Sequence, residues 1–109
     1  MKEIMAFIRD KKYERTKEAL TLLGFPGMTV VPVLGRGRKI QNNKLKTDDF
    51  AVIPKKLISI VVPDEDVNLI VEVIMKINST GRYGDGKIFI CPITQSIRLR
   101  TDETGDAVL

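Results

Sequence analysis

The chain has no histidine, no tryptophan and a single cysteine among its 109 residues. Without histidine, the side chain that most often serves acid–base catalysis and metal binding is missing. One cysteine forms neither an internal disulfide nor a paired-thiolate zinc site, so Cys91, which lies in an apolar run, is predicted to be a small buried hydrophobic residue. No nucleophile–base pair is visible, and we predict a protein that is not an enzyme and has no metal site built from its own side chains.

The sequence also lacks long hydrophobic stretches. No apolar run approaches the roughly 20 residues that a membrane span needs, and Met1–Ile4 has none of the apolar core of a signal peptide. The apolar fraction of 43% and charged fraction of 29% are typical of a globular protein. We therefore predict one domain over residues 1–109, a cytoplasmic location and no membrane span.

Positive charge is concentrated in one segment. Residues 36–56 hold seven Lys or Arg residues against two Asp residues, which exceeds the net charge of +4 for the whole chain. A basic segment could contact nucleic acid, but Phe50 is its one aromatic residue, too few for a base-stacking platform. We predict that nucleic acid is not a partner.

The hydrophobic pattern predicts the element order βαββαβ, which is the α+β, ferredoxin-like arrangement with an antiparallel sheet. Its usual strand order, 4-1-3-2, puts the second strand at the sheet edge, where Pro32 is tolerated because an edge position needs no donor. Asp64 is predicted to cap the second helix, and Ile97–Arg100 to form a short fifth strand. The tail, 102–109, is predicted to be flexible. The predicted strands cover residues 2–9, 28–34, 57–62 and 87–92, and the predicted helices cover residues 11–23 and 64–79.

The glycine-rich stretch Thr80–Phe89 is the strongest functional signal. Its three glycines permit a turn whose N–H groups form a concave anion site, and Lys87 adds a positive charge. The same pattern is often only a turn, and Asp85 between two glycines is typical turn chemistry, although it could also be a base or a metal ligand.

Two further groups could meet a polyphosphate: Gly35–Arg38, and the pair Arg98 and Arg100. Each could equally be a solvated surface charge, and sequence spacing does not bring them together. Lys55 could bind a carboxylate or a phosphate, or could simply be solvated.

Taken together, these motifs resemble the PII nitrogen-regulatory protein family over nearly the whole chain. The residues that carry the resemblance are Gly27–Val30, Gly35–Arg38, Ile60–Asp64, Thr80–Gly81, Gly84–Phe89 and Ile97–Thr101. The resemblance implies a trimer of ferredoxin-like subunits with ATP/ADP sites between subunits, and a long T-loop, about residues 36–54, that engages target proteins. It implies no catalytic activity.

The resemblance also implies which residues bind ligands. Lys55, with Lys39, is the candidate contact for 2-oxoglutarate, which the family binds together with a Mg²⁺ ion. Thr29 and Val61 would lie near adenine, and Arg98 and Arg100 would reach the phosphates from the neighbouring subunit. The remaining ATP/ADP contacts would be Gly35, Gly37, Arg38, Gly84, Asp85, Gly86 and Lys87.

The chain departs from the family pattern in the T-loop. The loop has neither a tyrosine nor a serine, so the common modifications of the family are not expected. Lys39 stands where many relatives have a glutamine that helps to hold Mg²⁺, which leaves 2-oxoglutarate binding open. The Gly24–Gly27 turn and the altered loop look most like the nitrogen-fixation-associated branch of the family.

We therefore predict a signal-transduction protein that senses ATP/ADP and, where Lys39 permits, 2-oxoglutarate. It would act as a homotrimer or a mixed trimer with a paralogue, on nitrogenase, an ammonium channel or a protein of the glutamine synthetase class. The alternatives are a degenerate module that responds to nucleotide alone or to another small anion, and a slow ATPase, against which the missing nucleophile–base pair argues.

Overall fold

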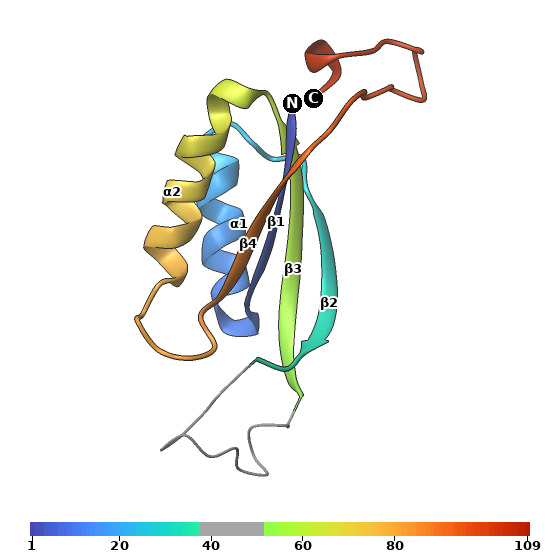
Figure 1. The fold of residues 1–109 in the computed structure, drawn as a ribbon. Helices are drawn as coiled ribbons and strands as arrows, with labels where there is room; N and C mark the ends of the chain where they lie inside the picture. The colour runs from blue at the N-terminus through green and yellow to red at the C-terminus, as the bar shows by residue number, and fades with distance from the viewer. Residues whose placement is uncertain (38–51) are drawn as a thin grey trace.

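The computed structural model describes residues 1–37 and 52–109. The element order is βαββαβ, as predicted, with short 3-10 helices at Asp10–Lys12, Asp64–Asp66 and Asp106–Val108 (Figure 1). The strands and helices are β1 (Lys2–Arg9), α1 (Tyr13–Leu22), β2 (Thr29–Gly35), β3 (Ile53–Val62), α2 (Val67–Asn78) and β4 (Gly86–Pro92).

The four strands form one antiparallel sheet in the order β2-β3-β1-β4, which confirms the predicted ferredoxin-like order. Strand β2 lies at an edge, so Pro32, opposite Lys56, removes no hydrogen bond that the sheet interior needs. Strand β3 begins at Ile53, four residues earlier than predicted. Strand β1 pairs with β3 only from Lys55 onward, so Pro54 has a partner strand on its β2 side but none on its β1 side. Proline, which lacks an N–H donor, is therefore tolerated at this position.

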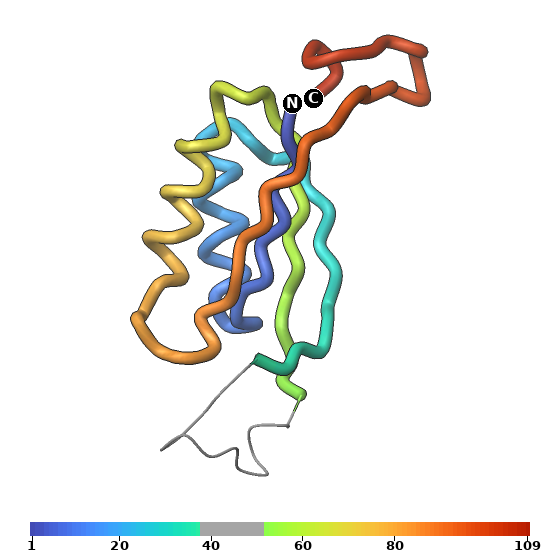
Figure 2. The backbone as a smooth tube through the Cα atoms, viewed as in Figure 1, coloured from blue at the N-terminus to red at the C-terminus, as the bar shows by residue number. Residues whose placement is uncertain are grey.

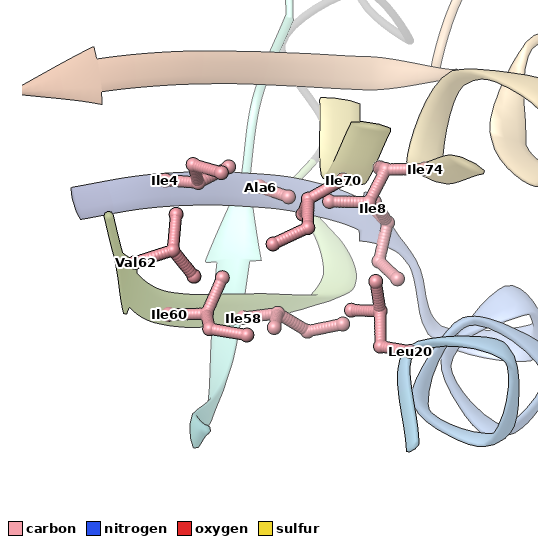
Figure 3. Packing of buried hydrophobic residues seen from close by; sticks show 9 residues of the cluster. All are labelled: Ile4, Ala6, Ile8, Leu20, Ile58, Ile60, Val62, Ile70 and Ile74. Carbon is pink, nitrogen blue, oxygen red and sulfur yellow. The ribbon is translucent and has the colours of Figure 1, made fainter. Parts of the chain in front are cut away.

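Both helices lie against the same face of the sheet, and the hydrophobic core fills the space between the two layers (Figure 1, Figure 3). Alternate residues of β1 and β3 point toward the helices, as the two-residue period of a strand requires. The core consists of nine buried side chains, Ile4, Ala6, Ile8, Leu20, Ile58, Ile60, Val62, Ile70 and Ile74.

A buried polar contact joins the two helices within this core. The Asn78 Nδ2 group donates to Thr16 Oγ1 at 3.0 Å and to the Ile74 carbonyl at 2.9 Å. Thr16 in turn donates to the Lys12 carbonyl at 2.8 Å. Asn78 Oδ1 is buried without a hydrogen-bond partner in the described part of the chain. The contact fixes how α1 and α2 lie against each other.

The predicted helix cap at Asp64 is wrong. Residues Asp64–Asp66 form a 3-10 turn without a side-chain cap, and α2 begins at Val67. The Asp64 carboxylate instead contacts Lys2 Nζ at 2.9 Å and the amino group of Met1 at 3.0 Å. The hydrogen bonds from Lys2 and from the terminal amine lower the pKa of Asp64. Asp64 therefore ties the start of β1 to the segment before α2.

The predicted fifth strand is also wrong. In the described C-terminal segment only a single bridge forms, between Ile97 and Thr104, and the chain turns at residues 99–101. Arg98 pairs with Glu103 at 3.3 Å. The C-terminal segment lies beyond the Pro92 end of β4, near the N-terminus (Figure 2). Its predicted flexibility stays a prediction.

The sheet face away from the helices is not covered by any described segment of this chain (Figure 1). Phe7 and Phe89 meet there edge to face, with ring centroids 6.0 Å apart. Cys91 lies opposite Glu3 and is half-buried rather than fully buried as predicted. Other residues of this open face, as we call it, are Met5, Thr29, Val31, Leu57, Ser59 and Val61. Neither helix in the described ranges is long and apolar enough to cross a bilayer.

Candidate functional site

The turn between α2 and β4 is organised by the Asp85 carboxylate. One carboxylate oxygen accepts hydrogen bonds from the amides of Thr80 at 2.7 Å and Gly81 at 2.9 Å. The other accepts the Thr80 hydroxyl. These bonds from Thr80, together with those from Arg9 and Gly81, hold the pKa of Asp85 far below its usual range. The sequence left Asp85 open as a turn residue, a base or a metal ligand. Its hydrogen bonds show that it is a turn residue.

Arg9, the last residue of β1, holds the same turn from the sheet. Its Nη1 atom contacts Asp85 Oδ1 at 2.5 Å, and its Nη2 atom donates to the Tyr83 carbonyl at 3.0 Å. Both the Arg9 and the Asp85 side chains are about four-fifths buried, with 21% and 22% exposed. Sequence reasoning missed Arg9, and the available signal was a basic residue ending the strand beside β4.

Lys55 is the second cation at this turn. It pairs with Arg9 in the β1–β3 register, and its Nζ atom donates to the Gly84 carbonyl at 2.5 Å. Burial, with a smaller contribution from the neighbouring Arg9 charge, lowers the pKa of Lys55. Lys55 is therefore engaged within the chain and is not a solvated surface lysine.

Two glycines, Gly84 and Gly86, let the turn approach the Arg9 side chain and the β1 backbone closely. Gly84 has φ +95, and a Cβ at that position would lie 3.3 Å from Arg9 Nη2. Gly86 has φ +113, and its Cβ would lie 1.8 Å from the Phe7 carbonyl oxygen. Both conformations are ones that glycine adopts readily and other residues avoid. The glycines of this motif are thus required by the fold of the turn itself.

The structure brings together part of the predicted nucleotide site. Gly35 ends β2 beside Lys55, so closely that a Cβ added at position 35 would lie 3.4 Å from Lys55 Cγ. Gly37 is the last described residue before the segment 38–51, and Arg38 and Lys39 lie outside the described residues, as does most of the predicted T-loop. At this end of the sheet the structure gathers Gly35, Lys55, Gly84, Asp85, Gly86 and Lys87.

The other predicted residues lie apart from the turn within this chain. Thr29 and Val61 lie on the open face, on β2 and β3. Arg98 and Arg100 lie past the opposite end of β4, a strand of seven residues and so roughly 20 Å long (Figure 1). They do not meet the turn within this chain, and their predicted role at the phosphates stays a prediction.

A cavity of about 430 Å³ lies beside the turn, between α2 and β4. Ile74, Met75, Ile88 and Ile90 give it a mostly apolar lining, and Asn78 also lines it. Arg9 and Lys55 are not among the residues that line it. Within the described ranges, no three His, Cys, Asp or Glu side chains gather as metal ligands would.

Comparison with known proteins identifies the family. The family model for "Nitrogen regulatory protein P-II" matches residues 1–103. The chain is 52% identical to "Nitrogen fixation nifHD region GlnB-like protein 2" of Methanobacterium ivanovii, with both chains covered completely. It is 47% identical to "Nitrogen regulatory protein P-II 2" of Methanothermobacter thermautotrophicus, covering 96% of this chain and 94% of that one. "Nitrogen regulatory protein P-II" of Porphyra purpurea is 46% identical over the full length of both. The predicted resemblance is confirmed, and the chain belongs to the P-II family of nitrogen regulatory proteins.

Proposed function

We propose that this P-II protein senses ATP and ADP at the Thr80–Lys87 turn and controls a target protein through its T-loop, residues 36–54. The observation that carries the proposal is the gathering of Arg9, Lys55 and Lys87 from three strands around one glycine turn. Cations gathered beside a glycine turn suit a polyphosphate. The family points to a regulatory protein rather than an enzyme.

The open face supports a trimer as the working form. P-II proteins are generally trimers that regulate target proteins. On this face Phe89 is 48% exposed and Val31 is 40% exposed, and a second layer would remove both side chains from water. In such an assembly, a homotrimer or a mixed trimer with a paralogue, Arg98 and Arg100 of one subunit would reach the phosphates at the turn of the next.

The T-loop joins β2 to β3 at the same end of the sheet as the turn (Figure 1). A ligand bound between Gly35, Lys55 and the turn would therefore lie at the base of the loop. A ligand shifts the loop only as far as it binds one loop state better than another. Because the loop is basic, we expect an acidic target surface, a cytoplasmic protein of nitrogen metabolism such as nitrogenase, an ammonium channel or glutamine synthetase.

The names of the relatives favour nitrogenase among these targets. Those of Methanobacterium ivanovii and Methanococcus maripaludis are named for the nifHD region of nitrogen fixation. The name describes those proteins, and its transfer to this chain is part of the proposal.

A second candidate is a P-II module that responds to nucleotide alone or to another small anion. Lys55, the proposed contact for a 2-oxoglutarate carboxylate, donates to the Gly84 carbonyl within the chain. Lys39 would add a further positive charge where Mg²⁺ would have to bind. Both features favour nucleotide binding that is indifferent to 2-oxoglutarate.

Calorimetry of the purified protein with MgATP, and then with 2-oxoglutarate added, tests both candidates. Binding of MgATP that 2-oxoglutarate tightens is the expected result for a sensor of energy and nitrogen status. Binding that ignores 2-oxoglutarate would establish the second candidate. No binding of ATP or ADP by the assembled protein would contradict both versions of the nucleotide site.

A further inference from the structure

Charge is distributed unevenly along the length of the sheet. The end from which the T-loop leaves also carries four exposed or half-buried cations outside that loop (Figure 1). They are Lys11 and Lys12 of the first 3-10 helix, Arg15 of α1 and Arg82 of the glycine turn. Within residues 1–37 and 52–109, none of these four side chains makes an ion pair. We call the four residues the loop-end patch.

The opposite end of the sheet is acidic. Lys2 and Arg98 lie there, but each already pairs with an acid, at 2.9 Å and 3.3 Å. The acidic residues of this end lie before α2 and in the C-terminal segment, and are Asp64, Glu65, Asp66, Asp102, Glu103 and Asp106. A charge distribution of this kind turns the loop end toward a negatively charged surface during approach.

The two acids that adjoin the patch in sequence do not neutralise it. Asp10 pairs with Lys56 of β3 at 3.0 Å, and Glu14 pairs with Lys17 at 2.8 Å. The Asp10 pair also fixes the 3-10 helix against β3, so the backbone that carries the first two cations of the patch is held in place. Binding then does not have to order this backbone, which lowers its entropic cost.

Tyr83 indicates that the partner is a protein. Its side chain is 69% exposed beside Arg82, and its carbonyl is held by Arg9 Nη2 at 3.0 Å. Tyr and Arg side chains are enriched in protein–protein interfaces and among the residues that dominate their affinity. A lipid surface is instead matched by an amphipathic helix with a free apolar face. Helix α1 has none to offer, because Thr16 and Leu20 bury its inner face in the core.

We infer that the loop-end patch is a docking surface for an acidic segment of the target protein, which it binds alongside the T-loop. The inference rests on the proposed function, in that the partner is taken to be the target that the T-loop engages. It adds a contact on the body of the protein, so that affinity for the target depends on cations outside the T-loop.

The test compares two double variants that have the same net charge. Lys11→Gln with Lys12→Gln, the patch variant, removes two positive charges from the loop-end patch. Asn68→Asp with Gln95→Glu, the control variant, adds two negative charges at exposed positions, in the first turn of α2 and beyond β4. The probe is poly-L-glutamate, an acidic polypeptide, and its Kd is measured by calorimetry at low and at high salt.

We expect the patch variant to bind poly-L-glutamate about fivefold more weakly than the wild type at low salt, the usual effect of two lost surface charge pairs. The difference should shrink at high salt, because salt screens exposed charges. The control variant should stay within about twofold of the wild type. Arg15→Gln and Arg82→Gln, tested singly, should each weaken binding by about twofold.

Equal Kd values for the two double variants would overturn the inference, since net charge alone would then account for binding. A wild type that does not bind poly-L-glutamate would overturn it as well. Vesicles of phosphatidylglycerol test the alternative surface: weaker vesicle binding by the patch variant, with equal poly-L-glutamate binding by both double variants, would assign the patch to lipid. If the wild type binds no MgATP, the nucleotide part of the proposed function fails, and the poly-L-glutamate comparison still decides the role of the patch.

Discussion

Gly86 lies against Phe7 so closely that a Cβ at position 86 would be 1.8 Å from the Phe7 carbonyl oxygen. Gly86 is the first residue of β4, opposite Ile8 in the register with β1. The close approach brings the end of the turn onto the β1 backbone and so places Asp85 within reach of Arg9. The conformation of the turn therefore depends on a contact between backbones as well as on the side-chain contacts of Arg9 and Lys55.

Gly86→Ala should destabilise the protein by at least about 2 kcal/mol, because the new methyl group meets backbone and the φ of +113 is strained for alanine. The measurement is the urea midpoint of unfolding. Gly27→Ala is the matched control: its Cβ would meet nothing within 4 Å, and we expect a change within about 0.5 kcal/mol. Equal midpoints for the two variants would contradict the close contact.

Acid should weaken the turn through Asp85. The hydrogen bonds from Thr80 lower the pKa of this carboxyl in the folded protein. A lowered pKa contributes stability above the unfolded value of about 3.9, and this contribution is lost as the pH falls below it. Asp85→Asn should therefore have a lower free energy of unfolding than the wild type at pH 7. This difference in free energy should become smaller as the pH falls from about 4 to about 2. Urea midpoints of both proteins across this pH range test the prediction. A difference in midpoint that does not change with pH would show that the ionised Asp85 carboxylate does not stabilise the fold.

Most of the fold can be predicted from the sequence, because periodicity reports which face of a segment is buried. The predicted bounds of β1 and the predicted edge position of β2 are confirmed. The alternation of Ile97–Arg100 is misleading, because a strand also needs a partner and no described strand lies beside it. From the sequence, Pro54 is expected to end the loop, whereas it lies in β3. Proline is tolerated there because β1 does not extend to this position, and the sequence does not show where β1 stops pairing.

The candidate site can be predicted only in part. The glycine turn is a local motif, and the spacing of Gly84, Asp85 and Gly86 is enough to find it. Arg9 escapes sequence reasoning because its contact with Asp85 spans 76 positions and depends on the registers of two strand pairs. Contacts of this kind follow from tertiary structure and leave no pattern in the neighbouring residues.

The buried contact between Thr16 and Asn78 should be energetically coupled. Thr16→Val leaves Asn78 Nδ2 with only the Ile74 carbonyl as acceptor, and should cost about 1–3 kcal/mol. Asn78→Leu removes the donor together with the unpartnered Oδ1 atom. The double variant should be more stable than the sum of the two losses predicts, by about 1 kcal/mol. Strict additivity in urea unfolding would show that the two side chains do not stabilise each other.

Lys87 should contribute directly to nucleotide binding. It follows Gly86 on β4, is exposed, and opposes Phe7 on the open side of the sheet. Lys87→Ala should weaken MgATP binding by about 1–3 kcal/mol, the cost of a lost charge-assisted hydrogen bond, and Arg38→Ala should act similarly. Calorimetry measures the change, with Lys17→Ala on α1, which pairs with Glu14, as the control for lost charge. Titrations unchanged in both site variants would rule out the assigned contacts.

The open face should carry the contacts between subunits. Phe89→Glu places a charge beside Phe7 on this face, and burial of that charge in an interface costs more than its exposure in a monomer. We expect the variant to shift from trimer to monomer in light scattering at micromolar concentration. Leu22→Glu makes the same change on α1, where the side chain is 81% exposed, and should leave the assembly intact. A trimer that survives Phe89→Glu but not Leu22→Glu would place the interface on the helices. The same variant should also bind MgATP more weakly than the wild type. Arg98 and Arg100 lie beyond the end of β4 that is far from the turn, so under the proposed function they reach the turn of a neighbouring subunit. A monomeric Phe89→Glu variant would lack these contacts, although every residue around its own turn is unchanged.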